Sequence, residues 1–116
     1  MIKTFNDLKV YQKSYKLALK VHRITYTFPH TEKYELGSQL RRAAVSIPAN
    51  IAEGYGNTNK EFKRYLKIAN GSSNEVRVYI EMSYDLEYIN KEIRDQLLGE
   101  YEILSKQIYS LKAKWS

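Results

Sequence analysis

The chain has 116 residues, a formal net charge of +6, 43% hydrophobic residues and 28% charged residues. These values are typical of a single globular domain and exclude an intrinsically disordered chain. The absence of cysteine excludes disulfides, cysteine-based zinc sites and thiol nucleophiles. The sequence has no apolar run of the roughly 20 residues that a membrane span needs, and its first residues lack the apolar core of a signal peptide. We therefore expect one cytoplasmic domain over residues 1–116, with no membrane contact.

The positive charge is concentrated near the N-terminus. Residues 1–31 carry six Lys and Arg side chains against Asp7 alone, a balance of +5, whereas residues 32–90 balance at zero. A local excess of positive charge favours polyanionic partners, nucleic acid first among them. The alternative is that the positive charge only keeps the protein soluble and has no specific partner, and the sequence leaves both interpretations open.

The first predicted helix covers about residues 7–27, with Asn6 or Asp7 as its N-cap and Phe28-Pro29 at its end. At 100° per residue, its basic side chains fall into one narrow stripe. The apolar side chains fill a broader arc than a surface helix needs, so we expect the helix to contact more than one neighbour. The stripe consists of Lys9, Lys13, Lys16, Lys20 and Arg23. The arc includes Tyr11, Tyr15, Leu17, Leu19, Val21 and Tyr26.

The second predicted helix covers about residues 34–53 and ends at Gly54, which we expect to form a left-handed C-cap. Its second half, residues 43–52, is apolar almost all round and is predicted to be deeply buried. Pro48 lacks an N–H group and predicts a kink there.

A polar line also crosses this second helix, within about one quadrant of the helical wheel. Its members are Gln39, Arg42, Ser46, Asn50 and Glu53. Buried polar groups need partners, so we favour a structural network, within the chain or across subunits, over a ligand site. Glu75 on the next helix is expected to join this network by pairing with Arg42.

The third predicted helix begins at the capping-box pattern Thr58 to Glu61 and runs to about Leu86. It carries two apolar stripes, so we expect one to face the core and the other a neighbouring subunit. We expect close helix packing at Gly71 to offset its low helix propensity. The first stripe contains Phe62, Tyr65, Leu66, Ala69, Ser73, Val76, Ile80 and Tyr84. The second contains Ile68, Ser72, Tyr79, Met82 and Leu86.

The fourth predicted helix follows a tight connection at residues 88–90, with Asn90 as its N-cap. Its apolar positions recur at helical spacing: Ile93, Leu97, Tyr101, Leu104, Ile108, Leu111 and Trp115. Four helices joined by short loops predict an all-α, antiparallel up-down-up-down bundle.

Signatures of catalysis are sparse. The chain has no phosphate-binding loop, and its two histidines, His22 and His30, lie far from any metal-ligand pattern, so we expect no metal and no cofactor. Glu53 and Glu75 on adjacent helices are a conceivable acid–base pair, but a structural role is favoured for both. We predict a protein that is not an enzyme.

A second basic row strengthens the case for nucleic acid. Lys60, Lys63, Arg64 and Lys67 share one face at the start of the third helix. Rows of Lys and Arg follow a phosphate backbone without reading its sequence. Tyrosines are frequent, and exposed ones would stack on unpaired bases, whereas those on the apolar stripes are expected in the core or at an interface.

Residues 39–54, QLRRAAVSIPANIAEG, form a distinctive motif. It is accompanied by Phe5-x-x-Leu8, Phe28-Pro29, Glu61-Phe62, Tyr65-Leu66 and Ala69-x-Gly71-Ser72-x-x-Glu75. Together these residues resemble the four-helix-bundle family of S23 ribosomal or 23S rRNA intervening-sequence proteins, over nearly the whole chain. Arg41, Arg42, Ser46, Asn50, Glu53 and Glu75 match the polar positions of that family. Glu87 stands where relatives often have glycine.

The resemblance implies a small bacterial protein that assembles as a homopentamer. Some members are encoded within intervening sequences of 23S rRNA genes, and the biochemical role of most is not established. A related protein is the accessory variability determinant of diversity-generating retroelements, a basic pentameric bundle that associates with nucleic acid and a reverse transcriptase. The partners that the resemblance suggests are the chain itself, nucleic acid, and another protein such as a reverse transcriptase.

Two hypotheses follow. The first is a non-catalytic oligomeric bundle that binds structured RNA or DNA through its basic helix faces, without strong sequence specificity. The alternative is a protein-interaction scaffold with no nucleic-acid role, whose basic face meets acidic protein surfaces.

Overall fold

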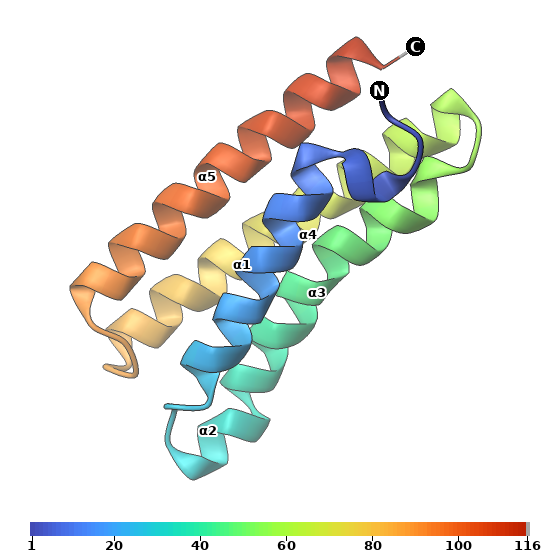
Figure 1. Ribbon diagram of the computed structural model, residues 1–116. Coiled ribbons are helices and arrows are strands. Elements are labelled where there is room, and N and C mark those ends of the chain that lie inside the picture. Colours follow the sequence, from blue (N-terminus) through green and yellow to red (C-terminus); the bar gives the residue numbers. More distant parts are fainter. Residues whose placement is uncertain (116) are drawn as a thin grey trace.

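The computed structural model describes residues 1–115 and consists of four long helices packed as an antiparallel bundle (Figure 1). The all-α, up-down-up-down prediction is confirmed. The long helices are α1 (Lys9–Thr25), α3 (Leu36–Tyr55), α4 (Asn59–Asp85) and α5 (Lys91–Lys114). A short 3₁₀ helix, Phe5–Asp7, precedes α1, and the short helix α2, His30–Tyr34, precedes α3. Within the described residues, no helix is long and apolar enough to cross a membrane.

Each long helix occupies one corner of the bundle. α3 packs along both α1 and α4, while α5 packs along α4 and more lightly against α1. As a consequence, α1 and α4 lie at diagonally opposite corners. Hydrogen bonds fix the antiparallel register of α3 and α4, because Ser46 bonds Ser72 at 2.9 Å and Gln39 bonds Tyr79 at 3.2 Å.

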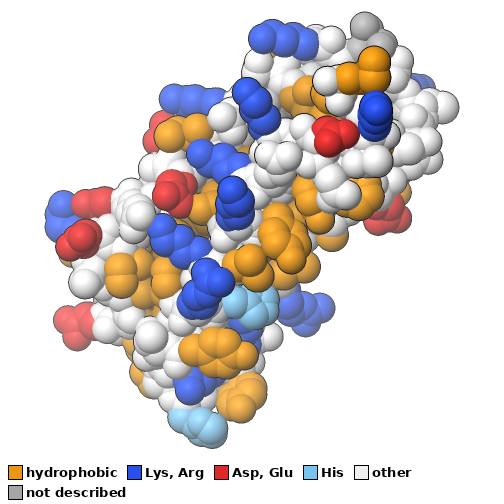
Figure 2. All heavy atoms as spheres, in the orientation of Figure 1, with side chains coloured by type: hydrophobic (Ala, Val, Ile, Leu, Met, Phe, Trp, Pro, Cys, Tyr) orange, Lys and Arg blue, Asp and Glu red, His pale blue; other side chains and the backbone are white. Residues whose placement is uncertain are grey.

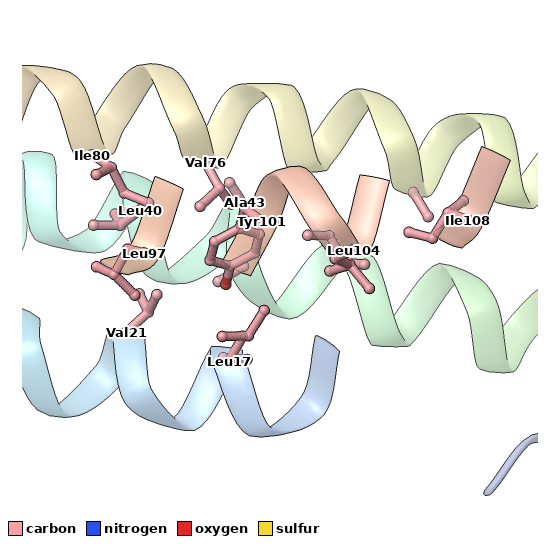
Figure 3. Packing of buried hydrophobic residues seen from close by; sticks show 14 of the residues in the cluster. Leu17, Val21, Leu40, Ala43, Val76, Ile80, Leu97, Tyr101, Leu104 and Ile108 are labelled. Carbon is pink, nitrogen blue, oxygen red and sulfur yellow. The ribbon is translucent and has the colours of Figure 1, made fainter. Parts of the chain in front are cut away.

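One face of every long helix enters a common core (Figure 3). Leu17 and Val21 of α1 lie opposite Leu97 and Tyr101 of α5 in this view. The predicted first stripe of α4 is confirmed as the buried one, and the predicted apolar positions of α5 are buried at its centre. The most deeply buried of these side chains are Phe62, Leu66, Ala69, Val76, Ile80, Leu97, Tyr101, Leu104 and Ile108.

The prediction that residues 43–52 are buried all round is wrong in part. Ala44, Ile47 and Ile51 are fully buried, but Val45 and Ala49 are exposed. The physical reason is that a corner helix has two neighbours, so its outward face stays uncovered in a single chain. Pro48 is buried within α3, which continues through it.

The N-terminal cap differs from the prediction. The Thr4 side chain accepts a hydrogen bond from the Asn6 N–H, and the Asp7 carboxylate accepts from the Lys3 N–H at 2.8 Å and the Thr4 N–H at 3.1 Å. These bonds lower the pKa of Asp7. The predicted caps Asn6 and Asp7 are therefore wrong, because both lie in the 3₁₀ helix before α1.

Arg41 joins three helices where α1, α2 and α3 meet. Its guanidinium donates from Nη1 to Thr25 Oγ1 at 2.9 Å and from Nη2 to the Lys33 carbonyl oxygen at 2.8 Å. The short helix α2 was not predicted, and it moves the start of α3 to Leu36. Arg41 thus has a structural role at this corner.

Gly54 is not the C-cap that the sequence predicts. It lies inside α3, which ends one residue later, and no glycine in the described residues has a positive φ. A Cβ atom at Gly54 would lie 2.5 Å from Tyr65 Cβ, closer than packed carbon atoms approach. Gly54 therefore permits the close approach of α3 and α4.

The expectation of close packing at Gly71 is wrong within the chain. A Cβ atom there would have no neighbouring atom within 4 Å among the described residues.

Two predicted caps are confirmed, since Thr58 accepts from the Glu61 N–H at 3.2 Å and Asn90 accepts from the Ile93 N–H at 2.8 Å. The Glu61 carboxylate itself binds Arg64.

The α4–α5 turn contains a backbone conformation that favours glycine. Glu87 has a φ of 67°, in the left-handed region. No other non-glycine residue among residues 1–115 has a positive φ. A Cβ atom in this region approaches the following carbonyl oxygen too closely. The turn therefore carries local strain at Glu87.

Candidate nucleic-acid interface

The basic stripe of α1 lies on the outer surface of the bundle. α1 directs Val10, Leu17 and Val21 into the core, and helical geometry places the cations about 100° around the helix from them, on the flank beside α5. Lys9, Lys16 and Arg23 are exposed, and Lys13 and Lys20 are half-buried. Figure 2 shows Lys and Arg side chains along the front of the molecule, over α1.

Little negative charge lies close to this stripe. Lys20 Nζ lies 3.7 Å from Glu100 Oε1 on α5, and no other cation of the stripe has a carboxylate within 4.0 Å in residues 1–115. The pair is partly exposed, so it contributes little stability. From Lys9 to Arg23 the helix rises by about 21 Å. The stripe is thus an extended cationic surface with four cations not neutralised by an adjacent carboxylate.

The second basic row occupies the other side of the molecule. Lys60, Arg64 and Lys67 are exposed at the start of α4, and Lys63 is half-buried. Arg64 is paired with Glu61 at 3.1 Å and lies over the Tyr65 ring. Since α1 and α4 lie at diagonally opposite corners of the bundle, a single chain does not bring the two basic rows onto one surface.

The polar line of α3 forms two separate sets of hydrogen bonds. The Asn50 side-chain amide donates to the Ser46 carbonyl oxygen at 2.7 Å and to Ser46 Oγ at 2.9 Å, and Ser46 bonds Ser72. The Tyr79 hydroxyl donates to Gln39 Oε1 near the other end of α3. These bonds join α3 to α4 and support a structural role for Gln39, Ser46 and Asn50.

The remaining polar residues do not join this network. Arg42, Glu53 and Glu75 are exposed, and the expected ion pair between Arg42 and Glu75 is absent from the described residues. Ion pairing is not required here, because water solvates both groups. The register of α3 on α4 places Glu53 level with Tyr65, about ten residues or 15 Å along the bundle from Glu75. The conceivable acid–base pair of Glu53 and Glu75 is therefore not assembled.

In residues 1–115, the members of the polar line are not gathered around one groove. An open groove of about 620 Å³ contains Gln39 and Arg42 beside Tyr34, Tyr79 and Leu86, but the other members of the line do not reach it. Among residues 1–115, no group of three or more His, Asp or Glu side chains is placed to hold a metal ion.

Sequence reasoning missed an exposed aromatic row on α1. Tyr15 is 49% exposed, Leu19 41% and Tyr26 67%, although all three belong to the arc that was expected to pack. Their spacing of four and seven residues places them on one face, about 100° around the helix from the basic stripe. Separating positions near Leu17 and Val21 from positions further around the wheel would have revealed this row.

Three members of the second apolar stripe of α4 are also exposed in the single chain. Met82 is 45% exposed, Leu86 49% and Ile68 39%, whereas Ser72 and Tyr79 are half-buried and bond α3. Single exposed apolar residues are ordinary, but a row along one helix face marks a surface suited to protein contact.

Comparison with known proteins assigns the chain to a protein family. The family model described as 23S rRNA-intervening sequence protein matches residues 6–110. The fold is similar to a crystal structure from Bacteroides thetaiotaomicron, described as a protein with unknown function from the S23 ribosomal protein family. That similarity has a TM-score of 0.83 and 24% identity, and covers 89% of this chain and 97% of the other. No curated protein matches this chain. The chain belongs to the family of 23S rRNA-intervening sequence proteins.

Proposed function

We propose that this protein is a non-catalytic, self-associating bundle that binds nucleic acid through basic helix faces, without strong sequence specificity. The observation that carries the proposal is the cationic stripe on α1, where five cations along about 21 Å have one carboxylate within ion-pairing distance among the described residues. Such a row attracts a phosphate backbone and releases its counterions on binding. The family name, which refers to an rRNA intervening sequence, supports the same class of partner.

Self-association rests on the exposed stripe of α4. Ile68, Met82 and Leu86 are 39–49% exposed, so covering this face with another copy would remove the remaining surface from water and contribute roughly half of the 1.5–3 kcal/mol that full burial of such a side chain gives. The stripe lies away from α1, so assembly through α4 would leave the basic stripes free. A ring of copies would repeat the stripe around its axis and raise the avidity for a long polyanion.

The binding proposal is tested with two double variants that change the net charge equally. Lys9→Glu/Lys16→Glu reverses two exposed cations of the α1 stripe, whereas Lys91→Glu/Lys106→Glu reverses two exposed lysines of α5. Fluorescence anisotropy with labelled RNA and DNA at about 50 mM salt measures the affinity. We expect the α1 variant to lose at least about tenfold in affinity and the α5 variant to lose much less, because the Debye length at this salt is short, between about 10 and 30 Å.

Two results would overturn the binding proposal. One is retained affinity after Lys9, Lys13, Lys16 and Lys20 are all replaced by Glu. The other is a specific protein partner that survives nuclease treatment of native complexes, together with no measurable affinity for RNA or DNA, which would favour a protein-interaction scaffold.

Self-association is measured separately by light scattering after size-exclusion chromatography. The monomer mass is 13.7 kDa, and a pentamer would give about 69 kDa. Met82→Asp/Leu86→Asp should dissociate the assembly, because it places charges in the α4 interface. A wild-type protein that remains a monomer at micromolar concentration would refute this part of the proposal.

A further inference from the structure

The exposed row of Tyr15, Leu19 and Tyr26, here called the aromatic row, runs parallel to the basic stripe on the same helix. In Figure 2, hydrophobic side chains lie next to the Lys and Arg side chains over α1. The basic stripe alone would serve any polyanion. The aromatic row beside it adds a second kind of contact to this face, because aromatic rings stack on flat unsaturated groups.

The ring of Tyr15 is held by its neighbours. Tyr11 and Tyr15 have ring centroids 6.0 Å apart, and Tyr11 meets Phe5 edge to face at 4.9 Å. Phe5 and Tyr11 pack against the core, which limits the rotamers available to Tyr15. A ring that is positioned before binding loses less conformational entropy on binding than a free one.

We propose that the α1 face binds single-stranded nucleic acid, with phosphates along the basic stripe and unpaired bases stacked on Tyr15 and Tyr26. This inference rests on the proposed function and specifies its partner. A duplex keeps its base faces stacked inside the helix, so it would leave the aromatic row without a partner. Single-stranded binders combine cationic grooves with aromatic side chains in this manner.

A second copy of the chain fits this face poorly. The basic stripe and the aromatic row adjoin on one helix, so an antiparallel two-fold contact through the row would place the two basic stripes on the same side of the interface. Like charges in such a contact would repel each other. The exposed stripe of α4, beside which α3 contributes Arg42 as a cation, lacks this conflict.

The spacing along α1 sets the length of strand that the face accommodates. Tyr15 and Tyr26 are eleven residues apart, or about 16 Å, which is the rise of about five nucleotides stacked at 3.4 Å. The two rings would therefore stack on bases about five nucleotides apart. We expect the affinity per chain to rise with strand length up to about six to eight nucleotides and then to level off.

The test compares unstructured oligouridylate with a duplex RNA of equal strand length, by fluorescence anisotropy at constant salt. We expect tighter binding of the single strand. Tyr15→Ala and Tyr26→Ala should each weaken that binding by about 5- to 150-fold, the usual effect of losing one stacked base. Tyr15→Phe and Tyr26→Phe should retain binding. Tyr109→Ala is the matched control, since Tyr109 is 69% exposed on the flank of α5 that bonds α4 through Ser105.

The outcomes separate this inference from the proposed function. If single strand and duplex bind equally, and the tyrosine variants match Tyr109→Ala while Lys9→Glu/Lys16→Glu abolishes binding, the single-strand inference is overturned and the nucleic-acid proposal stands. If the wild-type protein binds neither of these RNAs nor the corresponding single-stranded and duplex DNA, both are overturned. Selective loss of single-strand binding in the alanine variants, with rescue by phenylalanine, supports both.

Discussion

Replacing Gly54 by alanine tests the close approach of α3 and α4. The new Cβ atom would lie 2.5 Å from Tyr65 Cβ, 2.8 Å from Tyr65 Cγ and 2.9 Å from Tyr65 Cδ2. Tyr65 Cβ is fixed to the α4 backbone and has no rotamer that moves it away. The two helices must therefore separate by about 1 Å to restore ordinary carbon contact distances of about 3.5 Å.

The magnitude follows from two opposing effects. Overpacking a well-packed site costs about 1–3 kcal/mol, and this contact is at the severe end of that range. Alanine in a helix interior regains about 1 kcal/mol relative to glycine. We expect a net decrease of about 1–2 kcal/mol in the free energy of unfolding, or a fall of about 4–8 °C in Tm for a chain of this size.

Gly71→Ala is the matched control, because it is the same chemical change at an open helix position. It should raise the free energy of unfolding by about 1 kcal/mol through helix propensity. Urea unfolding followed by circular dichroism, at several protein concentrations to separate assembly from folding, measures both variants. A Gly54→Ala protein as stable as Gly71→Ala would refute the packing argument.

Three further predictions concern single side chains. The Tyr101 hydroxyl is buried without a hydrogen-bond partner in residues 1–115, so Tyr101→Phe should raise the free energy of unfolding by about 1 kcal/mol or more in urea titrations. Burial also raises the pKa of Tyr101, so the wild type should lose stability as the pH rises above about 10, the usual tyrosine pKa, and Tyr101→Phe should lose less. Glu87→Gly should stabilise the protein by about 1 kcal/mol in thermal unfolding, because glycine tolerates the positive φ. Backbone hydrogen bonds lower the pKa of Asp7, so an NMR pH titration should show the cap at residues 4–7 intact above about pH 4 and lost as the pH falls below it.

Helical periodicity predicted most of the fold. The spacing of Leu97, Tyr101 and Leu104 identifies the buried face of α5, and the local patterns at Thr58 and Asn90 identify two helix starts. These features depend on residues close in sequence. The short helix α2 has too few residues for a periodic pattern, and it is held by a hydrogen bond from Arg41 of the next helix, so the sequence did not reveal it.

Glycine positions show where local reasoning fails. Gly54 lies at the end of an apolar run, where a left-handed cap is the usual interpretation. Its actual role depends on the distance to Tyr65 on another helix, which no local pattern contains. For Gly71 the local argument expected a close neighbour, and the chain itself provides none.

The basic stripe was predictable because five cations at helical spacing must share one face. Its surroundings were not, since the pairing of Lys20 with Glu100 and the separation of the two basic rows depend on how α1, α4 and α5 pack. The exposure of Tyr15 and Tyr26 likewise depends on which arc of α1 the bundle covers.

The salt dependence of binding tests the central claim most directly. If the five cations of the α1 stripe contact phosphates, log K plotted against log salt concentration should have a slope of about −3.5 per engaged chain for a single strand, or about −4.5 for a duplex. Lys9→Ala/Lys16→Ala should reduce the slope by about two-fifths, while Lys91→Ala/Lys106→Ala should leave it unchanged. A slope near zero, or an equal reduction in both variants, would contradict the assignment of the α1 stripe as the phosphate-binding surface.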